Sequence, residues 1–460
     1  MTSMHDKPLA ISFLGGASTV TGSKTLLEFN NQKVLIDCGL FQGLKALRRL
    51  NWQPFPIDPS LINAVILTHA HLDHVGYIPL LVKNGFKGNI YATPPTCDLA
   101  RIILRDSAKL QEEEAALANE GKYSKHTPAE PLYTLNDAEK SLKQFVSTSD
   151  NTDIKLNDDF SFRFLRNGHI LGSALVEITY KDKKIVFSGD LGRPQSLLLE
   201  APTKITEADY LILESTYGDR DHKKSPLDAD LAEIVNEALM KQGNLIIPTF
   251  SVERAQEIMF ILTTLRGKNM IPANIPVYLD SPMGIDATDV MMKYPDWHTL
   301  SAESCTRIKN DIIKVRDIKD TIHVIKDKKS KIIIAGSGML SGGRVLEYLK
   351  AYVEDKRTTI LFVGFQAEGT RGRAMLNGIE KIKIHGNYYK VNAMLREISS
   401  FSGHADRNEI MQWLSYFTKM PDKIFLNHGE LKSSDALRKT IEETTKSHCI
   451  VPLLNEKIIL

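Results

Sequence analysis

The chain has 460 residues, with 58 basic and 56 acidic side chains and a formal net charge of +2. This length exceeds one ordinary hydrophobic core, so we expect two domains. The near-neutral total neither indicates nor excludes a nucleic-acid partner, because phosphate binding needs only a local basic groove. The four cysteines are far apart and fit neither a disulfide framework nor a metal-binding spacing, which is typical of a reducing compartment. With no signal-peptide pattern and no apolar run near the roughly 20 residues that cross a bilayer, we expect a cytoplasmic protein with no membrane contact.

Short β-branched runs alternate with turn residues in the first half of the chain. Strands are predicted at residues 9–14, 26–29, 33–36, 64–67, 89–92, 160–165, 175–180 and 184–188. Between residues 97 and 146 the sequence becomes charged and helical, which we interpret as an excursion over the surface. Closely spaced strands with helices between them predict a sheet-on-sheet core covered by helices.

From about residue 216 the pattern is a regular alternation of strands and helices. Helices are predicted at 227–240, 254–265 and 343–353, and strands at 244–247, 277–279, 331–335 and 359–362. Such alternation predicts a parallel sheet with helices on both faces. After about residue 389 come the segment 393–401, a helix at 407–417, a strand at 423–426 and a helix at 434–445. We expect this tail to rejoin the first domain.

The most informative stretch follows the predicted strand 64–67 and reads Thr68-His69-Ala70-His71-Leu72-Asp73-His74. His69 and His71, two residues apart in extended chain, can point at one metal ion. Asp73 and His74 begin a helix predicted to run through residues 80–82, so they turn toward a second ion. Imidazole and carboxylate are zinc ligands, and ion pairs about 3.5–4 Å apart serve phosphoryl displacement. Capping and packing are the weaker interpretation of this cluster.

Two further ligand candidates lie where predicted strands end. His169 stands in Asn-Gly-His-Ile-Leu-Gly, and Asp190 stands in Ser-Gly-Asp-Leu-Gly. The glycines allow a close approach of the backbone. Because a carboxylate has two oxygens, Asp190 is predicted to bridge two ions. Taken singly, each residue is explained equally well as a turn or capping residue.

These residues, with the strand-end Asp37, resemble the metallo-β-lactamase fold. Later segments resemble the β-CASP RNA-processing nucleases: Glu214 in Leu-Glu-Ser-Thr-Tyr-Gly looks like motif A, His404 in Phe-Ser-Gly-His-Ala-Asp like motif B, and His428 in Leu-Asn-His-Gly-Glu like motif C. The resemblance spans nearly the whole chain. It is to the compact, mostly bacterial type, related to the endonuclease subunit of the mRNA 3′-end cleavage machinery.

The resemblance implies an α/β fold, namely a metallo-β-lactamase αββα sandwich with an inserted parallel-sheet β-CASP domain and the active site in the cleft between them. The expected boundaries are 1–214 and 386–460 for the lactamase-like domain and 215–385 for the insertion. It also implies two Zn²⁺ ions. His69, His71 and His169 would hold one, Asp73, His74 and His428 the other, and Asp190 would bridge both.

The catalytic residues implied by the resemblance are Asp37, Asp73, Glu214 and His404. Asp37 would orient a metal ligand or the nucleophile, and His404, held by Glu214, would protonate the leaving oxygen. Without the resemblance, His404 is more simply a residue at the entry to a helix capped by Asp406.

Contacts to substrate phosphate are predicted from glycine-rich and basic segments. The strand-to-helix turn with Ser337, Gly338 and Met339 offers backbone amides, and Arg254 and Arg373 offer cations. A tight turn and solvated ion pairs are the competing interpretations. The family often has glycine where Glu253 stands, which puts Arg254 in doubt.

We therefore expect a zinc-dependent endoribonuclease that hydrolyses phosphodiester bonds of single-stranded RNA, because histidine at motif C is typical of RNA-cleaving members. A 5′→3′ exonuclease activity, Mn²⁺ in place of Zn²⁺ and a homodimer are left open. The competing hypotheses are a thioester or lactam hydrolase on the same metal site and a non-catalytic RNA-processing scaffold. The inserted domain and His404 disfavour the first, and the filled ligand positions disfavour the second.

Overall fold

The computed structural model describes residues 8–121, 126–222, 226–364, 366–398 and 401–460. The chain folds into two compact units. The first contains Met1–Ser196, Glu200–Asp221 and His404–Leu460, and the second contains Leu197–Leu199 and His222–Gly403. Within the described ranges, no helix is both long and apolar enough to cross a membrane.

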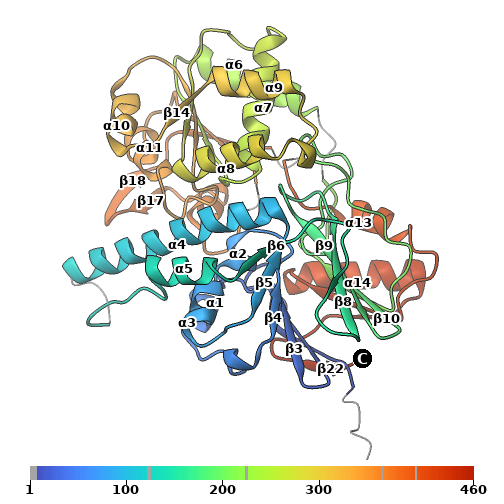
Figure 1. Ribbon diagram of the computed structural model, residues 1–460. Coiled ribbons are helices and arrows are strands. Elements are labelled where there is room, and N and C mark those ends of the chain that lie inside the picture. The colour runs from blue at the N-terminus through green and yellow to red at the C-terminus, as the bar shows by residue number, and fades with distance from the viewer. Residues whose placement is uncertain (1–7, 122–125, 223–225, 365, 399–400) are drawn as a thin grey trace, which may run out of the picture. The chain divides into compact units, whose positions relative to one another are not determined.

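In its described part, the first unit has two seven-stranded sheets (Figure 1). The first sheet has the order β22-β1-β2-β3-β4-β5-β6, and its strands are β1 Ala10–Gly15, β2 Lys24–Phe29, β3 Gln32–Ile36, β4 Ala64–Ile66, β5 Asn89–Ala92, β6 Phe145–Ser147 and β22 Lys457–Ile459. The second has the order β21-β20-β11-β10-β9-β8-β7, with β7 Ile154–Lys155, β8 Phe160–Arg166, β9 Ala174–Tyr180, β10 Lys183–Phe187, β11 Tyr210–Glu214, β20 Lys423–Asn427 and β21 Cys449–Ile450. Each strand predicted in the first half of the chain is present.

The core of this unit follows the two-residue period of its strands. Phe160, Phe162 and Phe164 of β8 pack between the two sheets, whereas Leu165 faces the opposite side. That outer side is covered by α13 Arg407–Leu414 and α14 Leu431–Thr445, through side chains such as Trp413. Because β20 pairs with β11 and β22 with β1, the tail rejoins the first unit, as predicted. The result is the expected sandwich of helices, two sheets and helices.

The helices beside the first sheet differ from the prediction in two ways. The helix expected from residue 73 to 82 is two helices, α2 Leu72–Val75 and α3 Ile78–Lys83, because Pro79 fits a first helical turn but not a helix interior. The segment expected to cross the surface forms α4 Pro94–Glu120, followed by α5 Leu135–Leu142. The first half of α4 is largely buried. Thr93, which precedes the helix, and Thr96, in its first turn, both donate hydrogen bonds to the carbonyl of Gly172. That half therefore belongs to the core.

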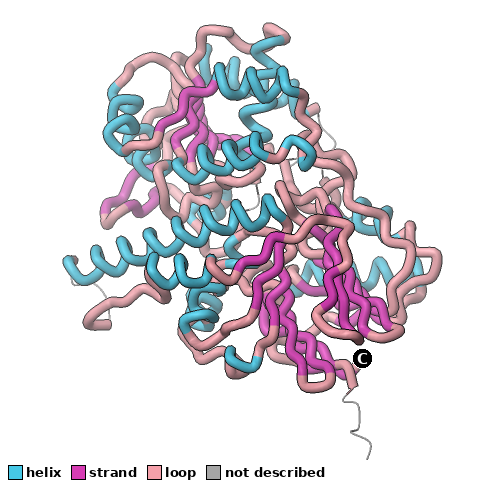
Figure 2. Tube along the Cα trace, viewed as in Figure 1, coloured by secondary structure: helices cyan, strands magenta, loops and turns pink. Residues whose placement is uncertain are grey.

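The second unit contains a six-stranded sheet in its described residues, with the order β14-β13-β15-β12-β16-β19 and parallel pairing throughout. The strands, magenta in Figure 2, are β12 Leu245–Pro248, β13 Val277–Asp280, β14 Ile312–Val315, β15 Ile332–Ala335, β16 Thr359–Phe362 and β19 Met394–Glu397. The helices are α6 Leu227–Met240, α7 Arg254–Gly267, α8 Pro282–Lys293, α9 Ala302–Asp311, α10 Ile318–Lys326, α11 Val345–Tyr352 and α12 Arg371–Leu376. A separate hairpin consists of β17 Lys381–Ile384 and β18 Asn387–Lys390.

Helices cover both faces of this parallel sheet, as the alternation predicted. Leu245 and Ile247 of β12 pack against α6 and α7, whereas Ile246 between them packs on the side of α11. Strand β19 pairs with β16, so the chain stays in the second unit until Gly403, and the expected boundary at 385/386 precedes this strand. Within the segment 393–401, residues 399 and 400 lie outside the described ranges.

Candidate metal centre

The first histidines of the centre lie in the loop that follows β4. The orientation of His69 is fixed by Thr68. The Thr68 hydroxyl lies 3.1 Å from Nδ1 of the His69 ring, so Nε2 of that ring points toward the other ligand candidates. Thr68 is itself held by Asp37, whose Oδ1 accepts from the Thr68 amide at 2.8 Å and whose Oδ2 accepts from its hydroxyl at 2.8 Å. The end of β3 thus positions the loop that follows its neighbour β4.

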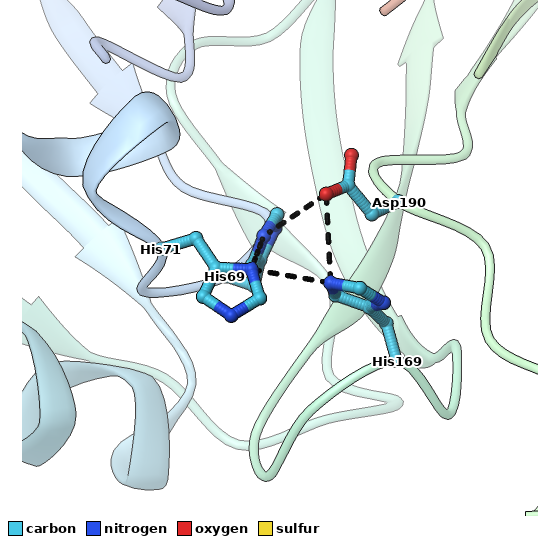
Figure 3. Close-up of side chains that lie close together, drawn as sticks. All are labelled: His69, His71, His169 and Asp190. Atoms are coloured by element: carbon cyan, nitrogen blue, oxygen red, sulfur yellow. Dashed lines mark hydrogen bonds and ion pairs between the residues drawn. The ribbon is translucent and has the colours of Figure 1, made fainter. Parts of the chain in front are cut away.

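One group of four side chains contains His69, His71, His169 and Asp190, whose ligand-type atoms lie within 4.8 Å of one another (Figure 3). Nδ1 of His71 is 3.0 Å from Nε2 of His69 and 3.2 Å from Nε2 of His169. Burial lowers the pKa of His69 to about 3 and that of His71 to about 4. Both rings are therefore neutral, which is the form that binds a metal ion.

A second group contains Asp73, His74 and His428. The Nε2 atoms of His74 and His428 are 3.1 Å apart, and Nε2 of His428 is 3.3 Å from Oδ2 of Asp73. His74 and His428 are buried, at 1% and 5% exposure. His428 follows β20 with a left-handed backbone (φ 52°), and its amide donates to the carbonyl of Gly16. The C-terminal part of the chain thus places His428 beside Asp73 and His74.

Asp190 joins the two groups. Its Oδ2 is 3.4 Å from Nε2 of His69 and 3.5 Å from Nε2 of His169, while its Oδ1 is 3.3 Å from Nε2 of His74. The carboxylate is 1% exposed, and its Oδ1 accepts no hydrogen bond in the described structure. Asp190 thus lies between the two groups, and its bridging of two ions stays a prediction.

These distances fit metal ions. Ligand atoms 2.0–2.2 Å from a tetrahedral zinc ion lie about 3.3–3.6 Å from one another. Two of the observed separations, 3.4 and 3.5 Å, fall in this range, and the other two, 3.0 and 3.2 Å, are slightly shorter. An orphaned, buried carboxylate oxygen also favours a cation beside it, and a metal ion would supply that charge. A metal-binding site is what this donor set can form.

Asp37 contacts the centre through His74. Its Oδ2 lies 2.8 Å from Nδ1 of His74, so it fixes the ring with Nε2 toward the second group. Burial alone would lower the pKa of His74, but the charges of Asp190 and Asp37 hold it well above its usual value. Asp37 has φ 59°, a left-handed conformation that is uncommon outside glycine. This contact is compatible with the predicted orienting role of Asp37, which stays a prediction.

His404 and Glu214 form a separate pair beside the first group. Nδ1 of His404 is 3.0 Å from Oε1 of Glu214, and its ring centre is 4.5 Å from that of His169. Glu214 is held by amides, since Leu191 donates to its Oε1 at 2.7 Å and Thr216 to its Oε2 at 3.2 Å. Although burial opposes it, the Glu214 carboxylate raises the pKa of His404 to about 9. His404 can therefore carry a proton at neutral pH.

Strand pairing explains why distant motifs meet. Strands β11 and β20 are parallel neighbours in which Glu214 lies opposite Asn427, so motifs A and C leave the same sheet edge side by side. Three supporting residues were not predicted: Thr68, Asn427, whose side chain donates to the carbonyl of Gly15, and Asn167, whose side chain donates to those of Ser188 and Asp190. Each is a polar residue just before a ligand candidate or two residues away, which is a usable sequence signal.

The residues predicted to contact phosphate belong to the second unit and already have partners. Arg254 is 7% exposed and pairs with Glu257, so phosphate contact requires this ion pair to separate. Arg373 pairs with Glu368 at 2.9 Å. In the turn after β15, the carbonyls of Ser337, Gly338 and Met339 accept from Leu340, Gln366 and Gly372. These bonds use carbonyls and not the amides predicted to contact phosphate. Contact of all these residues with phosphate stays a prediction.

Glu253, the residue before Arg254, has an unusual backbone. It has φ 67° and ψ −58°, caps α7 without a side-chain hydrogen bond and is 4% exposed. Glycine adopts such a positive φ without steric penalty. A glycine at this position, as resembling proteins often carry, thus has a backbone explanation.

Three family profiles match the chain in succession. Residues 20–231 match the Metallo-beta-lactamase superfamily, residues 255–375 the Beta-Casp domain, and residues 388–452 the Zn-dependent metallo-hydrolase RNA specificity domain. The matched ranges include every residue of the two histidine groups.

Curated relatives match over nearly the whole chain. A ribonuclease of Thermus thermophilus is 34% identical over 439 residues, covering 93% of this chain and 94% of that protein. An RNase J-like protein of Methanocaldococcus jannaschii is 32% identical, covering 96% of this chain and 98% of that protein. The transcription termination factor FttA of Methanococcus maripaludis is 31% identical, covering 99% of this chain and 72% of that protein.

A solved structure has the same fold. A protein of unknown function from Enterococcus faecalis aligns with a TM-score of 0.57, covering 99% of this chain and 100% of that one, at 14% identity. At that identity the likeness concerns the fold alone.

Proposed function

Because the chain belongs to the β-CASP family of the metallo-β-lactamase superfamily, we propose that it is a metal-dependent ribonuclease that cleaves single-stranded RNA internally by hydrolysing phosphodiester bonds. The single observation that carries this proposal is the pair of ligand groups that share Asp190. Such a pair suits the displacement of a phosphate ester, because both the attacking and the leaving oxygen need a cation.

Two zinc ions are the cofactor that the donor set favours. His69, His71 and His169 would hold one, Asp73, His74 and His428 the other, and Asp190 both. Bound there, divalent ions supply water activation and neutralise charge on the phosphate. Imidazole and carboxylate are common zinc ligands, and the match of residues 388–452 to a Zn-dependent metallo-hydrolase RNA specificity domain supports this choice.

His404 would deliver a proton to the leaving 3′ oxygen, which leaves a 5′ phosphate on the other product. Glu214 occupies the Nδ1 side of the ring at 3.0 Å, so the proton would be given from Nε2. The two amides that hold Glu214 keep its carboxylate oriented, and that carboxylate stabilises the imidazolium. Asp37 would hold His74 in the orientation that a ligand needs.

RNA is the preferred substrate because His428 stands at motif C and residues 388–452 match an RNA specificity domain. The relatives named as ribonuclease and RNase J-like support the same choice. Backbone amides and cations read phosphates, which carry little sequence information, so base preference should be weak.

The test uses zinc-loaded protein and single-stranded RNA labelled at the 5′ or the 3′ end. Wild type should produce internal fragments with 5′ phosphates, and His69→Ala should not. His448→Ala is the matched control, because His448 is exposed and outside both ligand groups. Intact RNA with wild type, or equal cleavage by His69→Ala, would refute the proposal. Hydrolysis of a thioester or lactam without RNA cleavage would favour a small-molecule hydrolase instead.

A further inference from the structure

A surface loop is anchored directly to the metal centre. The Cys38 amide donates to the carbonyl of His74 at 2.7 Å, and the Leu40 amide donates to that of Leu72 at 3.1 Å. After Leu40 the chain runs away from α2. It comes back to Phe41 at Asn51, which is 5% exposed. The side chain of Asn51 accepts from the Phe41 amide at 2.9 Å and donates to the Phe41 carbonyl at 2.8 Å. Residues 42–50 therefore form a closed loop whose base contacts the helix carrying Asp73 and His74.

The loop contributes nothing to the core. Its helix, α1 Lys45–Leu50, has no buried residue, and the flanking Leu44 and Trp52 are 51% and 60% exposed. A short helix usually owes its stability to an apolar face packed on the rest of the protein. In α1 only Leu47 and Leu50 are half-buried and the other four side chains are exposed, so packing accounts for little of this helix. Its cations are better explained by something that they bind. We call residues 44–52 the basic loop.

The charge of the basic loop is uncompensated. Lys45, Arg48 and Arg49 are exposed, and none of them forms an ion pair with a residue that the structure describes. No acidic residue occurs between Phe41 and Asp58. Most other arginines of the first unit, such as Arg105, Arg166 and Arg193, have carboxylate partners. The three cations and the exposed Trp52 that follows them in the sequence thus fit a ligand that has negative charge and a flat surface.

We propose that the basic loop binds the single-stranded RNA next to the bond being cleaved, with Lys45, Arg48 and Arg49 on phosphates and Trp52 stacked on a base. This inference rests on the proposed function and names its substrate contacts in the first unit. Single-stranded nucleic acids are bound by the combination present here, a cationic track with an aromatic side chain on which a base stacks. An acidic protein would satisfy the cations but gives no role to the exposed indole.

Two loop variants and one matched control test the inference. The first variant is Lys45→Gln with Arg48→Gln and Arg49→Gln, and the second is Trp52→Ala. The control is Lys87→Gln with Lys143→Gln and Lys155→Gln, which removes three exposed charges. Lys87 and Lys143 precede the amino ends of β5 and β6, the sheet edge opposite the metal centre. Binding of fluorescent single-stranded RNA is measured in a His404→Ala background. Hydrolysis of RNA and of bis(p-nitrophenyl) phosphate is measured without it.

The triple loop variant should raise the Kd and KM for RNA about tenfold or more, and should flatten the slope of log Kd against log salt by about 2, since three phosphate contacts are lost. Trp52→Ala should weaken RNA binding roughly 5- to 100-fold. Hydrolysis of bis(p-nitrophenyl) phosphate, too small to reach the loop, should be unchanged, as should all properties of the control.

Unchanged RNA affinity in both loop variants would overturn the inference. If the variants then failed to bind a protein partner, the basic loop would be a protein-binding surface and the inference would be equally wrong. Equal loss of small-diester and RNA hydrolysis would also overturn it, because the loop would then support the metal centre alone. If wild type binds RNA through the loop but cleaves none, the inference stands and the proposed hydrolysis is wrong.

Discussion

Two buried aspartates, one in each unit, show how the same side chain takes different roles. Asp190 is 1% exposed and follows β10, and Asp280 is 0% exposed and ends β13. Asp280 accepts hydrogen bonds from Tyr348 at 2.6 Å and Thr321 at 2.7 Å, with Arg344 3.5 Å away. Among the residues that the structure describes, the ion-pair neighbours of the Asp190 carboxylate are imidazole nitrogens, at 3.3–3.5 Å.

The pKa values move in opposite directions. Burial is the largest influence on both carboxyls, and it raises the pKa of Asp280. At Asp190 burial is outweighed by His428, His74 and His69, which hold the pKa well below its usual value. Both hydroxyls bond Oδ2 of Asp280, and its Oδ1, which like that of Asp190 accepts no hydrogen bond in the described structure, has the Arg344 guanidinium 3.5 Å away. The orphaned oxygen of Asp190 has imidazole nitrogens as its neighbours instead. We infer that Asp280 is structural and that Asp190 is a metal bridge.

The largest effect is expected from Asp190→Asn, because an amide cannot bridge two cations as a carboxylate does. RNA cleavage should fall about 10⁴-fold, since losing two ions removes several kcal/mol of charge stabilisation. Elemental analysis should find fewer bound zinc ions. Asp182→Asn, at an exposed turn residue, is the control and should keep both properties. Full zinc content with normal turnover would remove the distinction between the two aspartates.

His404→Ala should separate proton delivery from metal binding. General acid catalysis contributes about 10²–10⁴-fold, so kcat should drop by about 10³ while the zinc content stays at the wild-type level. His448→Ala again serves as the control. Loss of zinc from His404→Ala would instead place this histidine among the metal ligands.

A smaller effect is expected from Asp37→Asn, which alters the residue behind His74. Zinc affinity or activity should fall about 10- to 100-fold, as is usual when the partner of a ligating histidine is lost. Competition with a zinc chelator measures the change in affinity. Retained affinity and activity would mean that the backbone of α2, in which the His74 amide donates to the carbonyl of His71, positions His74 sufficiently without this carboxylate.

Asp280→Asn should leave zinc content unchanged and lower stability by about 1–3 kcal/mol, the usual loss when buried hydrogen bonds are disturbed. Because the folded-state pKa of Asp280 is raised, the stability that its carboxyl contributes is full below the unfolded pKa near 4 and is lost as pH rises through the folded pKa. The difference in unfolding free energy between wild type and variant should therefore shrink from pH 4 upward. Urea unfolding at several pH values measures it, and a difference that grows with pH would contradict this explanation.

The sequence was most informative where chemistry and periodicity agreed. His69, His71 and His74 follow a strand, and their spacing alone indicated two directions for ligands. The parallel sheet and the helices on its two faces could also be predicted, because β-branched runs such as β12 and β15 alternate with amphipathic helices. These features depend on local sequence only.

Features that depend on distant contacts could not be predicted in the same way. The burial of the first half of α4 depends on Gly172, far along the chain. The late exit from the second unit depends on β19 pairing with β16, although its sequence Met-Leu-Arg-Glu is a weak strand signal. Arg254 looked available for phosphate, because the acid that pairs with it, Glu257, is one helical turn away and indistinguishable from a solvated residue.

The most direct test of the metal centre is anomalous diffraction at the zinc edge from crystals of zinc-loaded protein. We expect two peaks about 3.5–4 Å apart, one among His69, His71 and His169 and the other among Asp73, His74 and His428, with an oxygen of Asp190 directed at each. A single peak, or an Asp190 carboxylate turned away from both groups, would contradict the two-ion account.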